Sequence, residues 1–261
     1  MLCMEQKPQR YAGTILKKVK LTETVYHFYI QHLSPPTLYF YPGQYVSCII
    51  DPQTRRQYTC CSQPTPTQFE IVIDVSPMGV GSKYFLGKNE GDRVEYLAPL
   101  GSFALSDNSL KKIFVATGTG IAPFRSMILN EVHRSSLLVP SNIQELRTKN
   151  QEQVSTNDER WTTNYSLYWG LRFEHDLYWV HELEALARQY RGFQFFVSLS
   201  KPGSSWSGLT GHVTEHVLEM EKNFQNSEFY LCGNSAMINE MRSRLLRMNV
   251  EDKRIKSDLF Y

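Results

Sequence analysis

Residues 115–123, with the sequence VATGTGIAP, constrain the fold more than any other part of this chain. The apolar run at 113–116 predicts a buried strand, and the apolar spacing at 124–129 predicts a helix. A strand, a glycine turn and a helix start in this order leave backbone N–H groups free, with the positive end of the helix dipole behind them. Pro123 suits the first helical turn, because its missing N–H costs nothing there. The segment therefore predicts a phosphate or pyrophosphate site.

This turn does not match the ordinary Rossmann fingerprint, Gly-x-Gly-x-x-Gly. Gly118 and Gly120 fit, but Pro123 stands at the third glycine position. An acidic residue is also missing at the expected distance of about 20 residues. A glycine-rich turn without a ligand remains the alternative to an anion site.

Length and charge limit the class of protein. A chain of 261 residues predicts one large domain or two of ordinary size. Its 28 basic and 26 acidic residues give a net charge of +2, which favours neither a nucleic-acid partner nor an anionic membrane. The longest charge-free stretch, residues 33–50, is interrupted by proline and glycine and does not resemble a membrane helix. With no secretory signal at the N-terminus, we expect a cytoplasmic protein without membrane insertion.

The cysteines and histidines show no metal-binding spacing. The five cysteines are Cys3, Cys48, Cys60, Cys61 and Cys232. An iron–sulfur cluster needs four thiolates in grouped spacings, which this set does not provide. The seven histidines are scattered, so we expect free thiols and no metal.

The first part of the chain has the pattern of an antiparallel β-barrel. Runs rich in β-branched and aromatic residues, separated by proline and glycine, predict six strands. These strands are expected at 11–19, 25–30, 44–50, 57–62, 69–75 and 93–97, with one short helix at 82–86.

From Lys112 onward, strands and helices alternate, which predicts a parallel sheet covered on both faces. The strands are expected at 113–116, 166–171, 193–199, 228–231 and within 254–261; the helices at 123–133, 179–190, 213–221 and 235–248. We therefore predict two domains, 1–108 and 109–261. The polar segment 134–163 is predicted to be a surface insertion.

Four short motifs occur in order on these elements. They are Arg56-Gln57-Tyr58-Thr59, Gly79-Val80-Gly81-Ser82, the turn from Gly118 to Pro123, and Cys232-Gly233-Asn234. Each motif is weak alone. Together, over nearly the whole chain, they resemble the ferredoxin–NADP reductase superfamily of flavoproteins, and the bacterial ferredoxin or flavodoxin reductases in particular.

The resemblance implies an FAD site in the barrel domain. Arg56 would bind a phosphate with its fork of donors, Tyr58 would offer a flat face to the flavin, and Thr59 would place a hydroxyl beside the flavin N5. Gly79, Val80, Gly81 and Ser82 would hold the pyrophosphate at a helix start. A solvated arginine, a half-buried barrel tyrosine and an ordinary capped helix are the structural alternatives.

The resemblance also implies an NAD(P)H site in the second domain. Its expected members are Thr117, Gly118, Thr119, Gly120, Pro123, Arg172, Ser200, Lys201, Cys232 and Gly233. Lys201 could pair with a 2′-phosphate, which favours NADPH, with NADH possible. The aromatic ring of Tyr261 is expected to stack on the flavin, and Thr59, Cys232 and Tyr261 are the residues expected at the reacting atoms. Some relatives carry a glutamate two residues before that aromatic, whereas this chain has Leu259 there and Asp258 one position further back.

The predicted function is that of an FAD-dependent oxidoreductase. It would transfer hydride from NAD(P)H to the flavin and then electrons to a separate carrier such as ferredoxin or flavodoxin, as a monomer. Two enzymatic alternatives are the NAD(P)H reductase component of an oxygenase and a free-flavin reductase. A flavin-bearing subunit or nucleotide sensor of a larger complex is the non-enzymatic alternative.

Overall fold

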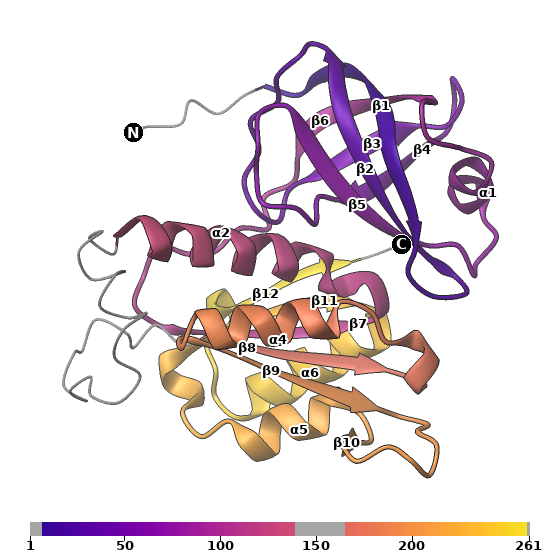
Figure 1. The fold of residues 1–261 in the computed structure, drawn as a ribbon. Coiled ribbons are helices and arrows are strands. Elements are labelled where there is room, and N and C mark those ends of the chain that lie inside the picture. Colours follow the sequence, from indigo (N-terminus) through magenta and orange to yellow (C-terminus); the bar gives the residue numbers. More distant parts are fainter. Residues whose placement is uncertain (1–6, 139–164, 260–261) are drawn as a thin grey trace, which may run out of the picture.

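The computed structural model describes residues 7–138 and 165–259, which build two separate six-stranded sheets (Figure 1). The first sheet is antiparallel, with strand order β4-β3-β6-β1-β2-β5. Its strands are β1 (Gln9–Lys20), β2 (Val25–Ser34), β3 (Tyr45–Ile49), β4 (Arg55–Thr59), β5 (Gln68–Asp74) and β6 (Arg93–Leu100). The six predicted antiparallel strands are therefore confirmed.

This sheet curls into a nearly closed barrel. Its two end strands, β4 and β5, are brought together by a bridge between Cys60 and Ile71. Alternate residues point inward, as a half-buried strand requires, and large apolar side chains such as Phe28 and Phe69 fill the interior. Helix α1 (Val80–Leu86) connects β5 to β6 along the chain and buries Phe85 in the same core.

The second sheet is parallel throughout, with strand order β10-β9-β8-β7-β11-β12. Its strands are β7 (Lys111–Thr117), β8 (Tyr165–Leu171), β9 (Phe193–Leu199), β10 (Leu209–Thr210), β11 (Ser227–Gly233) and β12 (Ile255–Leu259). After β7 the chain moves outward through β8, β9 and β10, and then returns to add β11 and β12 on the other side. The strand order thus reverses at β7, the kind of position where open α/β sheets bind ligands.

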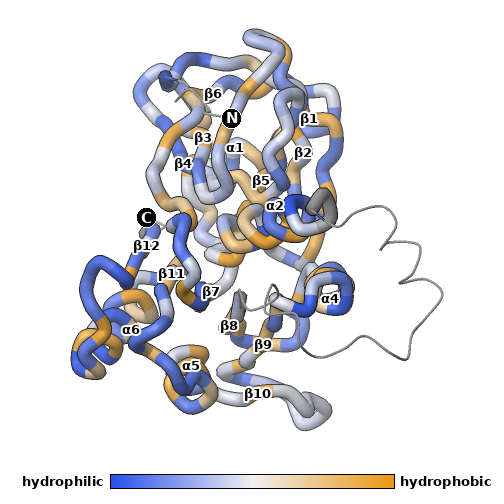
Figure 2. Tube along the Cα trace, turned by 90° about the vertical axis from the view of Figure 1, so that its left-hand side faces the viewer, coloured by the Kyte–Doolittle hydropathy of each residue, from blue (hydrophilic) through white to orange (hydrophobic). Residues whose placement is uncertain are grey.

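Helices cover both faces of this sheet. Helices α2 (Ala122–Leu138) and α4 (Val180–Gln189) pack on one face, and α5 (Val213–Met220) and α6 (Ser235–Arg247) on the other. The core beneath α2 and α4 also contains Val25, Cys61 and Val72 from the barrel. Helix α2 consequently lies between the barrel and the parallel sheet, as both views show (Figures 1 and 2).

Two segments differ in detail from the prediction. The glycine turn forms a short 3-10 helix, η1 (Gly118–Ile121), before α2 begins. Helix α2 continues to Leu138, so the first residues of the predicted 134–163 insertion are helical, and 139–163 lie outside the described residues. Over the two described ranges, no helix is both long and apolar enough to cross a membrane.

Candidate functional site

The predicted anion turn lies where the order of the parallel strands reverses. Gly118 has a φ of +53°, which favours glycine, and a Cβ there would meet no atom within 4 Å. Its carbonyl accepts hydrogen bonds from Trp169 Nε1 (2.9 Å) and from the Tyr178 hydroxyl (3.3 Å). Two large side chains therefore fix the turn from one side, and open space remains beside Gly118.

The turn packs directly against the Cys232-Gly233-Asn234 motif. A Cβ on Gly120 would lie 2.3 Å from the carbonyl oxygen of Cys232, and a Cβ on Gly233 would lie 2.2 Å from Thr117 Oγ1. The backbone N–H and side-chain amide of Asn234 both donate to Thr117 Oγ1, at 2.9 and 3.1 Å. The two motifs thus form one wall, and the contact leaves no room for side chains at either glycine.

Cys232 is completely buried behind this wall. It is paired in register with Asp258 on β12. Burial raises the pKa of the Cys232 thiol, and the nearby Asp258 carboxylate raises it further. Burial likewise raises the pKa of Asp258. The thiol is therefore protonated at neutral pH and is not suited to act as a nucleophile.

On the barrel, Arg56 and Tyr58 project from β4 toward the start of α1. A Cβ on Gly81 would lie 2.3 Å from Tyr58 Oη and 3.0 Å from Arg56 Cγ. The Tyr58 ring meets Phe85 edge-on, with centroids 5.0 Å apart. Arg56 is exposed and donates to the carbonyl of Arg55 at 2.7 Å; within 7–138 and 165–259 it forms no ion pair with a carboxylate. Its charge is therefore available to an anion.

The amino end of α1 has the features of a phosphate cradle. Gly79 occupies the N-cap position, no side chain caps the helix, and a Cβ at Gly79 would meet nothing within 4 Å. The first N–H groups of Val80, Gly81 and Ser82 follow, with Arg56 beside them. Thr59 ends β4 as a buried residue paired with Tyr45 of β3. The free backbone N–H groups at the start of α1, the guanidinium of Arg56 and the open space at Gly79 fit a pyrophosphate group.

The other predicted residues meet at the carboxyl ends of β8 and β9. The Ser200 N–H donates to Leu171 O (3.0 Å), and the Lys201 N–H donates to Arg172 O (2.9 Å). Arg172 and Lys201 are exposed. Glu174, two residues after Arg172, accepts a hydrogen bond at 2.7 Å from the N–H of Gly203, two residues after Lys201. Arg172, Ser200 and Lys201 are therefore brought together, at the same edge of the sheet as the glycine turn.

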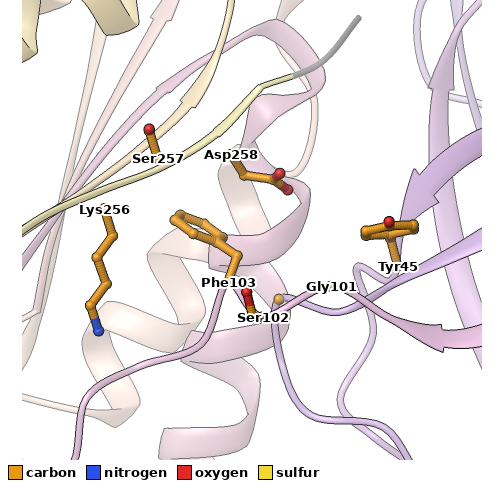
Figure 3. A pocket seen from close by; sticks show the side chains of 8 residues that line it. Tyr45, Gly101, Ser102, Phe103, Lys256, Ser257 and Asp258 are labelled. Atoms are coloured by element: carbon orange, nitrogen blue, oxygen red, sulfur yellow. The ribbon is translucent and has the colours of Figure 1, made fainter. Parts of the chain in front are cut away.

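A cavity of about 370 Å³ lies between the barrel and β12 (Figure 3). It is lined by Gly43, Tyr45, Gly101, Ser102, Phe103, Lys256, Ser257 and Asp258. The Asp258 carboxylate points across it toward the Tyr45 ring (Figure 3). Arg56 and Gly81 are not among the residues that line it. At the small end of ligand pockets, the cavity could hold one ring system but not a whole dinucleotide.

Sequence reasoning missed the barrel side of this cavity. Residues 42–45 have the sequence PGQY, which indicates only a turn before a strand. Gly101 has a φ of +87°, and a Cβ there would lie 2.8 Å from the Tyr45 ring, a contact that no local pattern announces. Asp258 carried the only signal, as an acidic residue near the end of the chain. The predicted stacking ring, Tyr261, lies outside the described residues.

Comparisons with known proteins agree with this two-part architecture. Residues 13–105 match the family model for the oxidoreductase FAD-binding domain, and residues 114–243 match that for the oxidoreductase NAD-binding domain. Over 85% of its length, the chain is 30% identical to the anthranilate 1,2-dioxygenase electron transfer component of Acinetobacter baylyi, of which it covers 58%. It is 28% identical to ferredoxin–NADP reductase B of Sorangium cellulosum, with 78% of each chain covered.

Among solved structures, the fold is similar to that of a cytochrome P450 reductase from Amycolatopsis. The TM-score is 0.79 at 24% identity, over 97% of this chain and 70% of the other. The chain spans little more than half the length of the anthranilate relative. The two matched domains and the order of their motifs establish that this chain belongs to the ferredoxin–NADP reductase superfamily of FAD- and NAD(P)-binding oxidoreductases.

Proposed function

We propose that this protein is an FAD-dependent reductase that takes hydride from NAD(P)H and passes electrons to a separate protein carrier. One observation carries the proposal: the flavin-side strand and the nicotinamide-side turn meet at one domain boundary. Cys61 lies two residues after Thr59, and its carbonyl accepts a hydrogen bond from Arg125, two residues after Pro123. Hydride transfer needs donor and acceptor within roughly 3–3.5 Å, which such an arrangement can provide.

The proposed FAD site is formed by β4 and the start of α1. Arg56 would bind a phosphate oxygen through its exposed guanidinium, and Gly79, Val80, Gly81 and Ser82 would donate backbone N–H groups to the pyrophosphate. Tyr58 would contact the ring system, and the Thr59 hydroxyl would lie nearest its reacting edge. We place the boundary between the FAD domain (1–108) and the NAD(P) domain (109–261) in the linker before β7.

The proposed NAD(P)H site follows the carboxyl edge of the parallel sheet. Thr117, Gly118, Thr119, Gly120 and Pro123 form one wall with Cys232 and Gly233, and the nicotinamide would lie against it. Arg172, Ser200 and Lys201 would bind the adenosine end. The exposed cations of Arg172 and Lys201 favour a 2′-phosphate, and therefore NADPH over NADH, since the nearby Glu174 carboxylate is already hydrogen-bonded to Gly203.

When bound, FAD would supply the redox chemistry, accepting two electrons as hydride and releasing them onward. The chain's residues would orient the two cofactors and exclude water. Buried Cys232 would contribute shape to the nicotinamide wall, without a covalent role. Asp258, whose pKa burial raises, is the carboxyl group among the residues that line the interdomain cavity, and its carboxyl oxygen could hold a proton there. We retain Tyr261 as the ring that stacks on the flavin. Its replacement by serine should strengthen nicotinamide binding, and unchanged cofactor kinetics would contradict the stacking role.

The proposed electron acceptor is a small redox carrier such as ferredoxin or flavodoxin. A second candidate is an oxygenase, because two of the similar proteins are electron transfer components of a dioxygenase and of a monooxygenase. In either case the acceptor would be a separate molecule or a part beyond this chain. We further propose that the protein acts as a monomer in the cytoplasm.

Stopped-flow mixing tests the proposal. The purified chain, reconstituted with FAD, is mixed under anaerobic conditions with NADPH and, separately, with NADH, and flavin absorbance is followed. We expect rapid bleaching, faster with NADPH. If neither nucleotide bleaches the flavin, the reductase proposal fails and a nucleotide sensor is favoured instead. Failure to retain FAD together with turnover of added flavin would indicate a free-flavin reductase.

A further inference from the structure

Arg125 lies at the start of helix α2, just after the glycine turn, and its side chain is buried between the two domains. Only 7% of the residue is exposed. Its Nε and Nη2 atoms donate to both carboxylate oxygens of Glu182 on α4, at 2.9 and 2.7 Å. The guanidinium is thus held in a fixed plane by a residue of its own domain.

The remaining nitrogen reaches the barrel. Arg125 Nη1 donates to the carbonyl oxygen of Cys61 (2.8 Å) and to Glu70 Oε2 (2.9 Å). The next residue of α2 adds a parallel contact, because Ser126 Oγ donates to the carbonyl oxygen of Ser62 at 2.5 Å. Two consecutive residues of the NAD(P) domain therefore hold two consecutive carbonyls of the barrel.

Side chains around the guanidinium complete the network. His27 Nε2 lies 2.9 Å from Glu70 Oε2, on the barrel side. Trp179 places its ring under the guanidinium, 4.5 Å from the centroid to Cζ, and meets the His27 ring edge-on at 5.2 Å. Burial opposes the charged form of Arg125, but its hydrogen bonds and acidic neighbours outweigh this effect, so its pKa is raised. The guanidinium is therefore always charged.

This network could be mistaken for a metal site. His27, Cys61 and Glu70 place a nitrogen, a sulfur and an oxygen within 4.8 Å of one another. However, Glu70 already binds a permanent cation, and a metal ion would be repelled by Arg125 at the same carboxylate. The cluster is thus better described as a buried ion-pair network.

We propose that Arg125, with Glu70 and Glu182, is a positioning residue that sets the orientation of the NAD(P) domain on the flavin domain. The positions of these contacts in the chain explain why Arg125 would affect hydride transfer. Cys61 is two residues from Thr59, and Arg125 is five residues from Gly120, so each tether is short. A single planar group bound on both sides of the boundary restricts both sliding and rotation between the domains. The expected effect on the rate of flavin reduction rests on the proposed reductase function, whereas the effect on domain orientation does not.

The variant Glu70→Gln tests this role. This substitution removes the negative charge of Glu70, and with it the ion pair between Arg125 and the barrel. It leaves the ion pair between Arg125 and Glu182 intact. Glu95→Gln is the matched control, because Glu95 pairs with Arg10 entirely within the barrel. With FAD bound, we expect Glu70→Gln to lower the limiting rate of flavin reduction by NADPH by about tenfold or more, with little change in the dissociation constant of NADPH. Glu95→Gln should behave as wild type.

A measurement independent of activity accompanies the kinetics. Spin labels are attached to Leu16→Cys in the barrel and Lys222→Cys in the second domain, both at exposed positions, in a Cys3→Ser background. Pulsed electron paramagnetic resonance then reports the distance between the two domains. Glu70→Gln should broaden this distance distribution, and Glu95→Gln should not. Arg125→Lys, which keeps the charge but loses the planar fork, should broaden it as well.

An unchanged distance distribution in both Glu70→Gln and Arg125→Lys would overturn the proposal, whatever the kinetics. A rate loss that appears wholly in NADPH binding, or equally in Glu95→Gln, would overturn the kinetic role. If wild-type flavin is not reduced by either nucleotide, the proposed function fails, while the distance measurement still decides whether Arg125 orients the domains.

Discussion

The barrel should lose stability in mild acid because of one buried histidine. His32 lies inside the barrel, 4% exposed, with its ring stacked on Phe69 at 5.3 Å. Its Nδ1 is 2.6 Å from the Tyr96 hydroxyl, whereas its Nε2 has no hydrogen-bond partner among the residues that the structure describes. A proton on Nε2 would be buried without compensation. Burial accordingly lowers the pKa of His32 from 6.5 to about 4.

The sign and size of the effect follow from linkage. Between pH 6.5 and pH 4 the unfolded chain binds a proton at His32 that the folded chain does not, so stability falls as the pH falls. Relative to pH 8, this group alone should cost about 2 kcal/mol at pH 5 and ~3 kcal/mol at pH 4. Above about pH 7.5 its contribution is nearly constant.

The assay is urea unfolding followed by far-ultraviolet circular dichroism at several pH values from 8 to 4.5. The perturbation is His32→Phe, which keeps an aromatic ring against Phe69 and removes the titrating group. The variant loses the bond to Tyr96 at every pH, which shifts its whole curve by about 1 kcal/mol. The informative quantity is therefore the slope of unfolding free energy against pH. We expect a distinctly shallower slope in His32→Phe, and parallel curves for the two proteins would refute the reasoning.

Three further predictions concern the proposed cofactor sites. Arg56→Ala should weaken FAD binding about tenfold or more in a fluorescence titration, whereas Arg55→Ala, at the neighbouring exposed position, should not; equal effects would argue against a phosphate contact. Gly120→Ala should destabilise the protein by about 2 kcal/mol or more in thermal unfolding, because its Cβ would lie 2.3 Å from a backbone oxygen. Gly87→Ala, whose Cβ would make only ordinary contacts of at least 3.6 Å, serves as its control. Lys201→Ala should raise the KM for NADPH several-fold more than that for NADH, and equal changes would exclude a 2′-phosphate contact.

The general architecture could be predicted because its determinants are local. Alternating β-branched and aromatic residues specify strands, and each of the six predicted barrel strands overlaps one in the structure. The alternation of strands with helices after Lys112 likewise specifies a parallel sheet. Boundaries moved by a few residues, and the two-residue strand Leu209–Thr210 was not predicted, because so short a strand has no periodicity of its own.

Contacts between the domains could not be predicted in the same way. From the sequence, Arg125 is only a basic residue at the start of a predicted helix, and Glu70 is only an acidic residue in a predicted strand. Their interaction depends on a separation of 55 residues and on how α2 meets the barrel. The cavity between Tyr45 and Asp258 depends on a still longer separation. Local patterns determine the two domains and their cofactor motifs, but hydride transfer also requires a definite orientation between them. That orientation depends on a few polar contacts between residues that are distant in the sequence. Arg125 belongs to none of the sequence motifs, yet its substitution is the most informative test of how the two domains are oriented.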